Sequence, residues 1–80
     1  MNSFAPKFKS MEIFKLKPEE EYIELNNLLK RLGWVVTGGE AKLAIKQGEV
    51  TVNDEVDTRV RKKMRLGDIA EYANQEVKVS

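Results

Sequence analysis

Residues 37–53, TGGEAKLAIKQGEVTVN, decide the fold of this 80-residue chain. Thr37 and Glu40 have the spacing of a capping box, in which the hydroxyl accepts from the amide three residues on and the carboxylate reaches back to the Thr37 amide. An apolar helix stripe follows, at the spacing i, i+3, i+4 and i+7: Ala41, Ala44, Ile45 and Gly48. Gly48 also supplies the left-handed conformation that ends a helix. The spacing therefore predicts a short helix between Thr37 and Gly48.

The residues around this helix indicate a positively charged frame. Val50 and Val52 alternate with polar residues, which predicts a half-buried strand over residues 49–53. Lys42 and Lys46 lie four residues apart, so both project from one side of the helix, off its buried stripe. A capped helix with two lysines, joined by one glycine to a strand, holds positive charge in a fixed position. Contacts with a phosphate backbone require this arrangement.

The other segments predict an α+β domain with two helices packed on a small, mostly antiparallel sheet. Residues 1–10 are expected to be flexible, and residues 11–80 to form the single domain, beginning with a strand over residues 11–16. A first helix is expected from Pro18 to Gly33, because proline and the glutamates that follow it favour a helix start. Its expected buried stripe consists of Tyr22, Leu25, Leu28, Leu29 and Leu32. Two hairpins are expected after the second helix. Their strands are residues 49–53 with 56–60, and residues 69–73 with 76–79.

Composition excludes several classes of function. The chain has no histidine and no cysteine, so it lacks the commonest general base, the commonest metal ligands and any disulfide. No spacing of carboxylates selects a catalytic pair, and we expect no enzyme activity, no catalytic or metal-binding residue, no cofactor and no small-molecule substrate. No apolar run approaches the roughly 18 residues of a membrane span. The N-terminus lacks the apolar segment of a secretory signal, so the expected location is the cytoplasm, without a membrane partner.

Charge is segregated along the chain, although the net charge is only +1. Residues 18–29 carry four glutamates and no basic residue. Residues 58–65 carry five basic residues and no acidic one: Arg59, Arg61, Lys62, Lys63 and Arg65. Blocks of opposite sign indicate one basic face, with acidic surfaces elsewhere.

Simpler structural explanations exist for each of these features. The lysine pair is compatible with a solvated helix face, and the run at residues 59–65 with an edge strand that charge protects from aggregation. Lys30 and Arg31 fall in the last turn of the first helix, where cations are favourable. Trp34 is expected to pack on the core rather than to form a base-stacking platform.

Residues 20–72 resemble the S-four RNA-binding domain, named for ribosomal small-subunit protein four, and we identify the chain as a small stand-alone bacterial member. The resemblance rests on the order and spacing of several elements: the helix ELNNLLKRLGW, the segment from Thr37 to Asn53, and Leu66-Gly67-Asp68-Ile69 near the end. Two positions differ from the family pattern. Gly38 stands where many members carry an arginine that faces RNA, and Asp54 replaces the usual turn glycine.

The resemblance implies that the chain has the αL motif of that family and binds structured RNA, such as ribosomal or transfer RNA. Phosphate contacts would come from the second helix and the adjacent strand. The candidate RNA-binding residues are Thr37, Gly38, Lys42, Lys46, Arg59, Arg61, Lys62 and Lys63. The alternative is a protein-binding adaptor module on a ribosome-associated or nucleic-acid-processing assembly, which the near-neutral charge and Gly38 favour.

Overall fold

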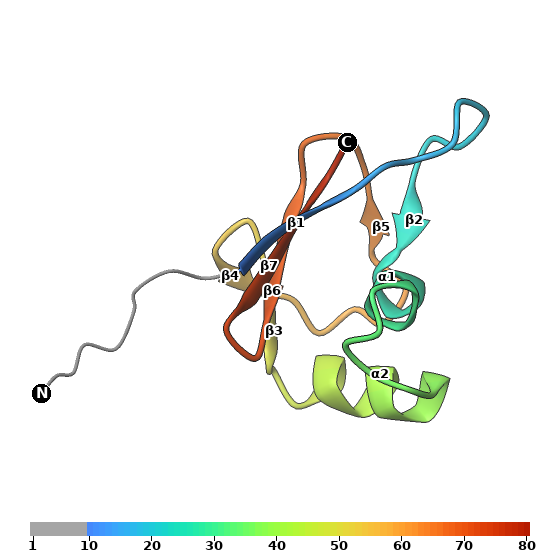
Figure 1. The fold of residues 1–80 in the computed structure, drawn as a ribbon. Helices are drawn as coiled ribbons and strands as arrows, with labels where there is room; N and C mark the ends of the chain where they lie inside the picture. The colour runs from blue at the N-terminus through green and yellow to red at the C-terminus, as the bar shows by residue number, and fades with distance from the viewer. Residues whose placement is uncertain (1–9) are drawn as a thin grey trace, which may run out of the picture.

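Two helices and two sheets make up residues 10–80, the part of the chain that the computed structural model describes (Figure 1). The strands are β1 (Ser10–Phe14), β2 (Ile23–Glu24), β3 (Val50–Val52), β4 (Glu55–Val56), β5 (Lys63–Met64), β6 (Ile69–Tyr72) and β7 (Gln75–Val79). The helices are α1 (Leu25–Arg31) and α2 (Gly38–Lys46). The main sheet has the order β1-β7-β6-β3-β4, and β2 pairs with β5 in a separate two-stranded sheet. Within residues 10–80 only the β1–β7 pair is parallel, which confirms the predicted α+β fold with a mostly antiparallel sheet.

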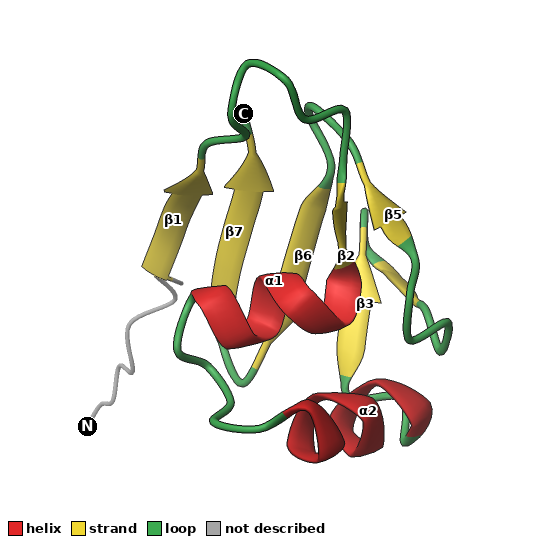
Figure 2. Cartoon of the chain, turned by 90° about the vertical axis from the view of Figure 1, so that its right-hand side faces the viewer, coloured by secondary structure: helices red, strands yellow, loops and turns green. Residues whose placement is uncertain are grey.

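One face of the main sheet is buried beneath the helices. Figure 2 shows α1 lying across this face, with α2 beyond the end of the sheet from which β3 rises. The buried side chains come from both helices and from three strands of the main sheet: Leu25, Leu28, Leu29, Ala41, Ala44, Ile45, Val50, Val52, Ala70, Val77 and Val79. None of the helices in the described part of the chain is long and apolar enough to cross a membrane.

Helix α2 begins and ends as the sequence predicts. The Thr37 hydroxyl accepts a hydrogen bond from the Glu40 amide at 3.1 Å, and Gly48 has a φ of +79° after the last turn. The reciprocal bond differs from the expectation by one residue. The Glu40 carboxylate accepts from the Val36 amide at 2.8 Å, not from the Thr37 amide. Both bonds hold the chain that enters the helix, so the position of α2 is fixed locally.

The expected start of the first helix at Pro18 is wrong. Pro18 lies in a turn, in which the Glu20 amide donates to the Lys17 carbonyl at 2.9 Å. Helix α1 begins only at Leu25, because Ile23 and Glu24 pair with β5. The glutamates therefore do not lie in a helical first turn. Gly33 follows the helix with a φ of +75°, which confirms the predicted end.

The two hairpins form, but with shorter or shifted strands. The first turns at Asn53 and Asp54, both with positive φ, and its second strand β4 covers only two residues instead of 56–60. The second turns at Ala73 and Asn74, one residue earlier than predicted. The first strand spans residues 10–14 rather than 11–16, and residues 1–9 of the segment expected to be flexible lie outside the described residues.

Candidate nucleic-acid interface

The first group of candidate residues lies on α2 and its cap. Thr37, Gly38, Lys42 and Lys46 are all exposed. The two lysines leave the helix away from its buried residues, as their spacing predicts. No ion pair between residues of the described range involves either lysine. Their charges are therefore available to a partner in solution.

The second group lies on residues 57–65, which we call the basic loop. Five basic side chains line one hollow of about 470 Å³: Arg59, Arg61, Lys62, Lys63 and Arg65. Four of them are predicted candidates. Arg65 was counted in the charged run but was not among the candidates, and its place in the hollow adds it to the group. Lys42 and Lys46 do not line this hollow, so the predicted residues fall into two groups.

Contacts with distant parts of the chain fix the basic loop. The carbonyls of Val60 and Lys62 accept from the amides of Asn26 and Leu25, at 3.1 Å and 2.8 Å. These amides open α1, so the loop caps that helix in place of a side chain. Met64 is fully buried. Between these anchors the run at residues 59–65 is mostly irregular, because only Lys63 and Met64 form a strand. The alternative explanation of this run as an edge strand therefore applies only to Lys63 and Met64.

An internal ion pair offsets the charge of Arg59. Its Nη2 lies 2.7 Å from Asp57 Oδ2, and its Nε donates to Oδ1 at 3.0 Å. The hydrogen bonds from this guanidinium lower the pKa of Asp57 below its ordinary value, and the carboxylate raises the pKa of Arg59. Arg59 remains 68% exposed. Arg61 has no such partner among the described residues, so it offers a freer charge than Arg59.

Tyr22 is a neighbour of the basic loop that sequence reasoning missed as a site residue. The Lys63 ammonium lies 5.0 Å and the Arg65 guanidinium 5.5 Å from the centroid of its half-buried ring. These are cation–π distances. The sequence assigned Tyr22 to the buried stripe of a helix, and its role could not be found because that helix begins three residues later.

The start of α2 has a further cation close to it. A Cβ at Gly38 would lie 3.7 Å from the Lys30 ammonium, which comes from the last turn of α1. The sequence placed Lys30 in the last turn of a helix and did not include it among the candidate residues. Because α1 packs against α2, Lys30 lies beside the first group of candidate residues.

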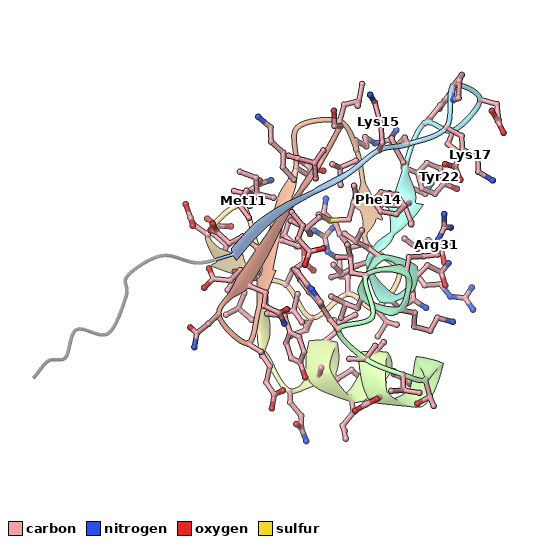
Figure 3. All side chains as sticks on the ribbon, viewed as in Figure 1. Met11, Phe14, Lys15, Lys17, Tyr22 and Arg31 are labelled. Atoms are coloured by element: carbon pink, nitrogen blue, oxygen red, sulfur yellow. The ribbon has the colours of Figure 1, made fainter. Side chains whose placement is uncertain are left out.

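Trp34 packs against the core, as predicted. Its ring is half-buried, and its Nε1 donates to a carboxylate oxygen of Glu12 at 3.4 Å. It is not a free platform for a base. Among residues 10–80, cation–π distances join Phe14 to Arg31, and Tyr22 to Lys63 and Arg65. Phe14, Tyr22 and Arg31 are labelled in Figure 3.

The chain is similar to a known domain family and to individual known proteins. The family model described as the S4 domain matches residues 15–80. YbcJ of Escherichia coli (strain K12), whose name describes it as a candidate RNA-binding protein, is 41% identical over 58 residues, which cover 72% of this chain and 83% of YbcJ. RlbA of Bacillus subtilis (strain 168), named as a probable ribosome maturation protein, is 40% identical over 53 residues, covering 66% of this chain and 75% of RlbA.

A solved structure supports the same grouping. The solution structure of YbcJ from E. coli, described as revealing an αL motif involved in RNA binding, matches this fold with a TM-score of 0.66. The match covers 98% of each chain at 36% sequence identity.

Proposed function

The chain belongs to the S4 domain family, and we propose that it binds structured RNA through α2 and the basic loop. The observation that carries the proposal is the hollow lined by five basic side chains on a loop held at both ends. A phosphate backbone is contacted by cations in fixed positions, and most contacts with nucleic acid go to phosphate and sugar. Because the loop is hydrogen-bonded to α1, its cations have fixed positions relative to the rest of the domain.

Helix α2 would supply the second set of phosphate contacts. Lys42 and Lys46 are exposed and unpaired among residues 10–80. The Thr37 oxygen already accepts from Glu40, so its hydroxyl proton is free to donate to a phosphate oxygen. Gly38 adds no side chain that would keep the backbone at a distance, and Lys30 adds a charge beside it. Such contacts favour a phosphate at the start of the helix.

The loop cations would recognise the shape of the RNA rather than its base sequence. Arg59 would contribute least of the loop cations, because Asp57 competes for its guanidinium. Direct reading of base pairs is not needed. A-form RNA presents a deep, narrow groove that side chains do not read, so recognition would depend on the shape of the RNA and the path of its phosphates.

The relatives guide the choice of RNA. YbcJ is named for RNA binding, and the name of RlbA refers to ribosome maturation. Neither name describes an enzyme, and we propose a binding role without catalysis. Ribosomal RNA is therefore the first RNA to test, and a ribosomal partner would place the protein in the cytoplasm.

Salt dependence of binding tests the proposal. Affinity for a ribosomal RNA hairpin should fall linearly on a log–log plot against salt concentration. Lys42→Ala, Lys46→Ala and Arg61→Ala should each weaken binding and reduce the slope by about one for each phosphate that is no longer neutralised. The matched control is Lys78→Ala, which removes the same charge from the exposed face of β7, opposite the core.

Two outcomes would contradict the proposal. Equal losses from Lys78→Ala would mean diffuse attraction without a defined surface. No binding by the wild-type protein at low salt would favour the protein-binding adaptor instead.

A further inference from the structure

A groove beside the basic loop has a lining unlike that of a phosphate site. It measures about 500 Å³ and lies between the segment around β2 and helix α1. One wall is formed by Tyr22, Ile23 and Glu24, and the other by Asn27, Lys30 and Arg31. We infer that this groove holds the base of a single unpaired RNA nucleotide, stacked on Tyr22. The inference rests on the proposed function. It adds contact with one base to the phosphate contacts proposed above.

Tyr22 links the groove to the basic loop. Its ring is half-buried and lines the groove, while Lys63 and Arg65 lie 5.0 Å and 5.5 Å from its centroid. An RNA strand that follows the basic loop therefore passes the tyrosine. Unpaired bases in RNA are commonly recognised by stacking on such rings. Ile23 also lines the groove, although its side chain is almost fully buried in the core.

The charges of the groove select a base rather than a phosphate. Glu20 and Glu24 both line it, and their carboxylates repel a phosphate group. The cations of the groove come from α1. Arg31 is held with its guanidinium 5.3 Å from the centroid of the Phe14 ring, as Figure 3 illustrates. Lys30 and Arg31 would neutralise the phosphates that flank the inserted nucleotide.

The polar groups of the groove favour guanine. The Asn27 amide lies 3.5 Å from a Glu24 carboxylate oxygen, so the two side chains are adjacent. A carboxylate accepts two parallel hydrogen bonds, and the guanine edge offers its N1–H and its amino group side by side. The Asn27 amide nitrogen can then donate to the neighbouring guanine O6. Uracil has only one donor on this edge and would leave part of the carboxylate unpaired. The volume is also that of a site for a small ligand, about 300–1,000 Å³.

Two blunt-ended RNA duplexes test the inference, one fully paired and one with a single bulged guanosine. At equal salt, the wild-type protein should bind the bulged duplex at least about fivefold more tightly, the low end of what base stacking on an aromatic ring contributes. Tyr22→Leu should lose this preference, so that the two duplexes bind with equal affinity. Tyr22→Phe should keep the preference. A duplex with a bulged uridine should be preferred less strongly over the paired duplex. Glu24→Gln should reduce the difference in affinity between the guanosine-bulged and uridine-bulged duplexes.

A measurement on the wild-type protein covers the case in which Tyr22→Leu fails to fold. The Tyr22 ring protons should move upfield on addition of the bulged duplex and not of the paired one. Equal affinity of the wild type for both duplexes, or no such shift, would overturn the nucleotide site and leave the proposed RNA binding intact. Binding to neither duplex would overturn both.

Discussion

Helix α2 and the basic loop carry the same charge but are held in place in different ways. Helix α2 is fixed by neighbours in sequence: the Thr37 hydroxyl, the Glu40 carboxylate and the glycine at 48. The basic loop is fixed by residues about forty positions earlier, through the amides at the start of α1 and the pairing of β5 with β2. The comparison shows that two basic regions of one domain can be held differently, one by contacts within a few residues and the other by contacts that exist only in the folded domain.

The largest effect should come from breaking the anchor of the basic loop. Met64 has no exposed surface, and Met64→Ala should lower the free energy of unfolding by about 2–5 kcal/mol through reduced burial and a cavity. Urea denaturation measures this change. Leu66→Ala is the matched control, because Leu66 is 69% exposed, and it should change stability by less than about 0.5 kcal/mol. Equal costs for the two variants would mean that Met64 does not anchor the loop.

A smaller effect should follow from weakening the local frame of α2. Thr37→Ala removes the acceptor for the Glu40 amide, and it should lower the free energy of unfolding by about 1 kcal/mol. Denaturant melts report the change, with the exposed Thr58→Ala as control. An unchanged midpoint for Thr37→Ala would show that the hydroxyl does not stabilise the helix start.

The same contrast explains what could be predicted from the sequence. The limits of α2 follow from Thr37, Glu40 and Gly48, because capping and helix termination act within a few residues. The positions of Lys42 and Lys46 on the helix follow from its period. The false helix start at Pro18 has the opposite cause. Its local signals favour a helix, but pairing of β2 with a strand far along the chain takes precedence.

The positions of the candidate residues were predictable to the same extent. The candidates on α2 are exposed and lie where the periodicity places them. The contact of Tyr22 with Lys63 and Arg65, and the approach of Lys30 to Gly38, depend on how β2, α1 and α2 pack. No spacing in the sequence encodes such contacts.

The smallest effect should come from releasing the paired cation of the basic loop, Arg59. Asp57→Asn frees its guanidinium, and RNA affinity should rise by up to about fivefold, since an ion pair whose guanidinium is exposed to solvent contributes at most about 1 kcal/mol. Asp54→Asn makes the same chemical change three residues away in the hairpin turn, without an ion-pair partner in the described range. An equal gain from both variants would indicate net charge alone.

The Asp57–Arg59 pair also predicts a pH dependence. The folded-state pKa of Asp57 is depressed by Arg59, so its contribution to stability is complete above the unfolded value of 3.8. That contribution is lost as pH falls through the lower folded-state pKa. The stability difference between the wild type and Asp57→Asn should therefore be constant near neutral pH and should shrink only below about pH 3.8. A difference that changes between pH 5 and pH 8 would point to another group.

The most direct test of the account is a titration of the labelled protein with a ribosomal RNA hairpin, followed by amide chemical shifts at low salt. The account predicts that the largest changes fall in two stretches, residues 37–46 and residues 59–65. It also predicts that Ile13 and Lys78, exposed partners on the outer face of β1 and β7, remain unchanged. Changes centred on that outer face, or no changes at all, would contradict the claim that α2 and the basic loop form an RNA-binding surface.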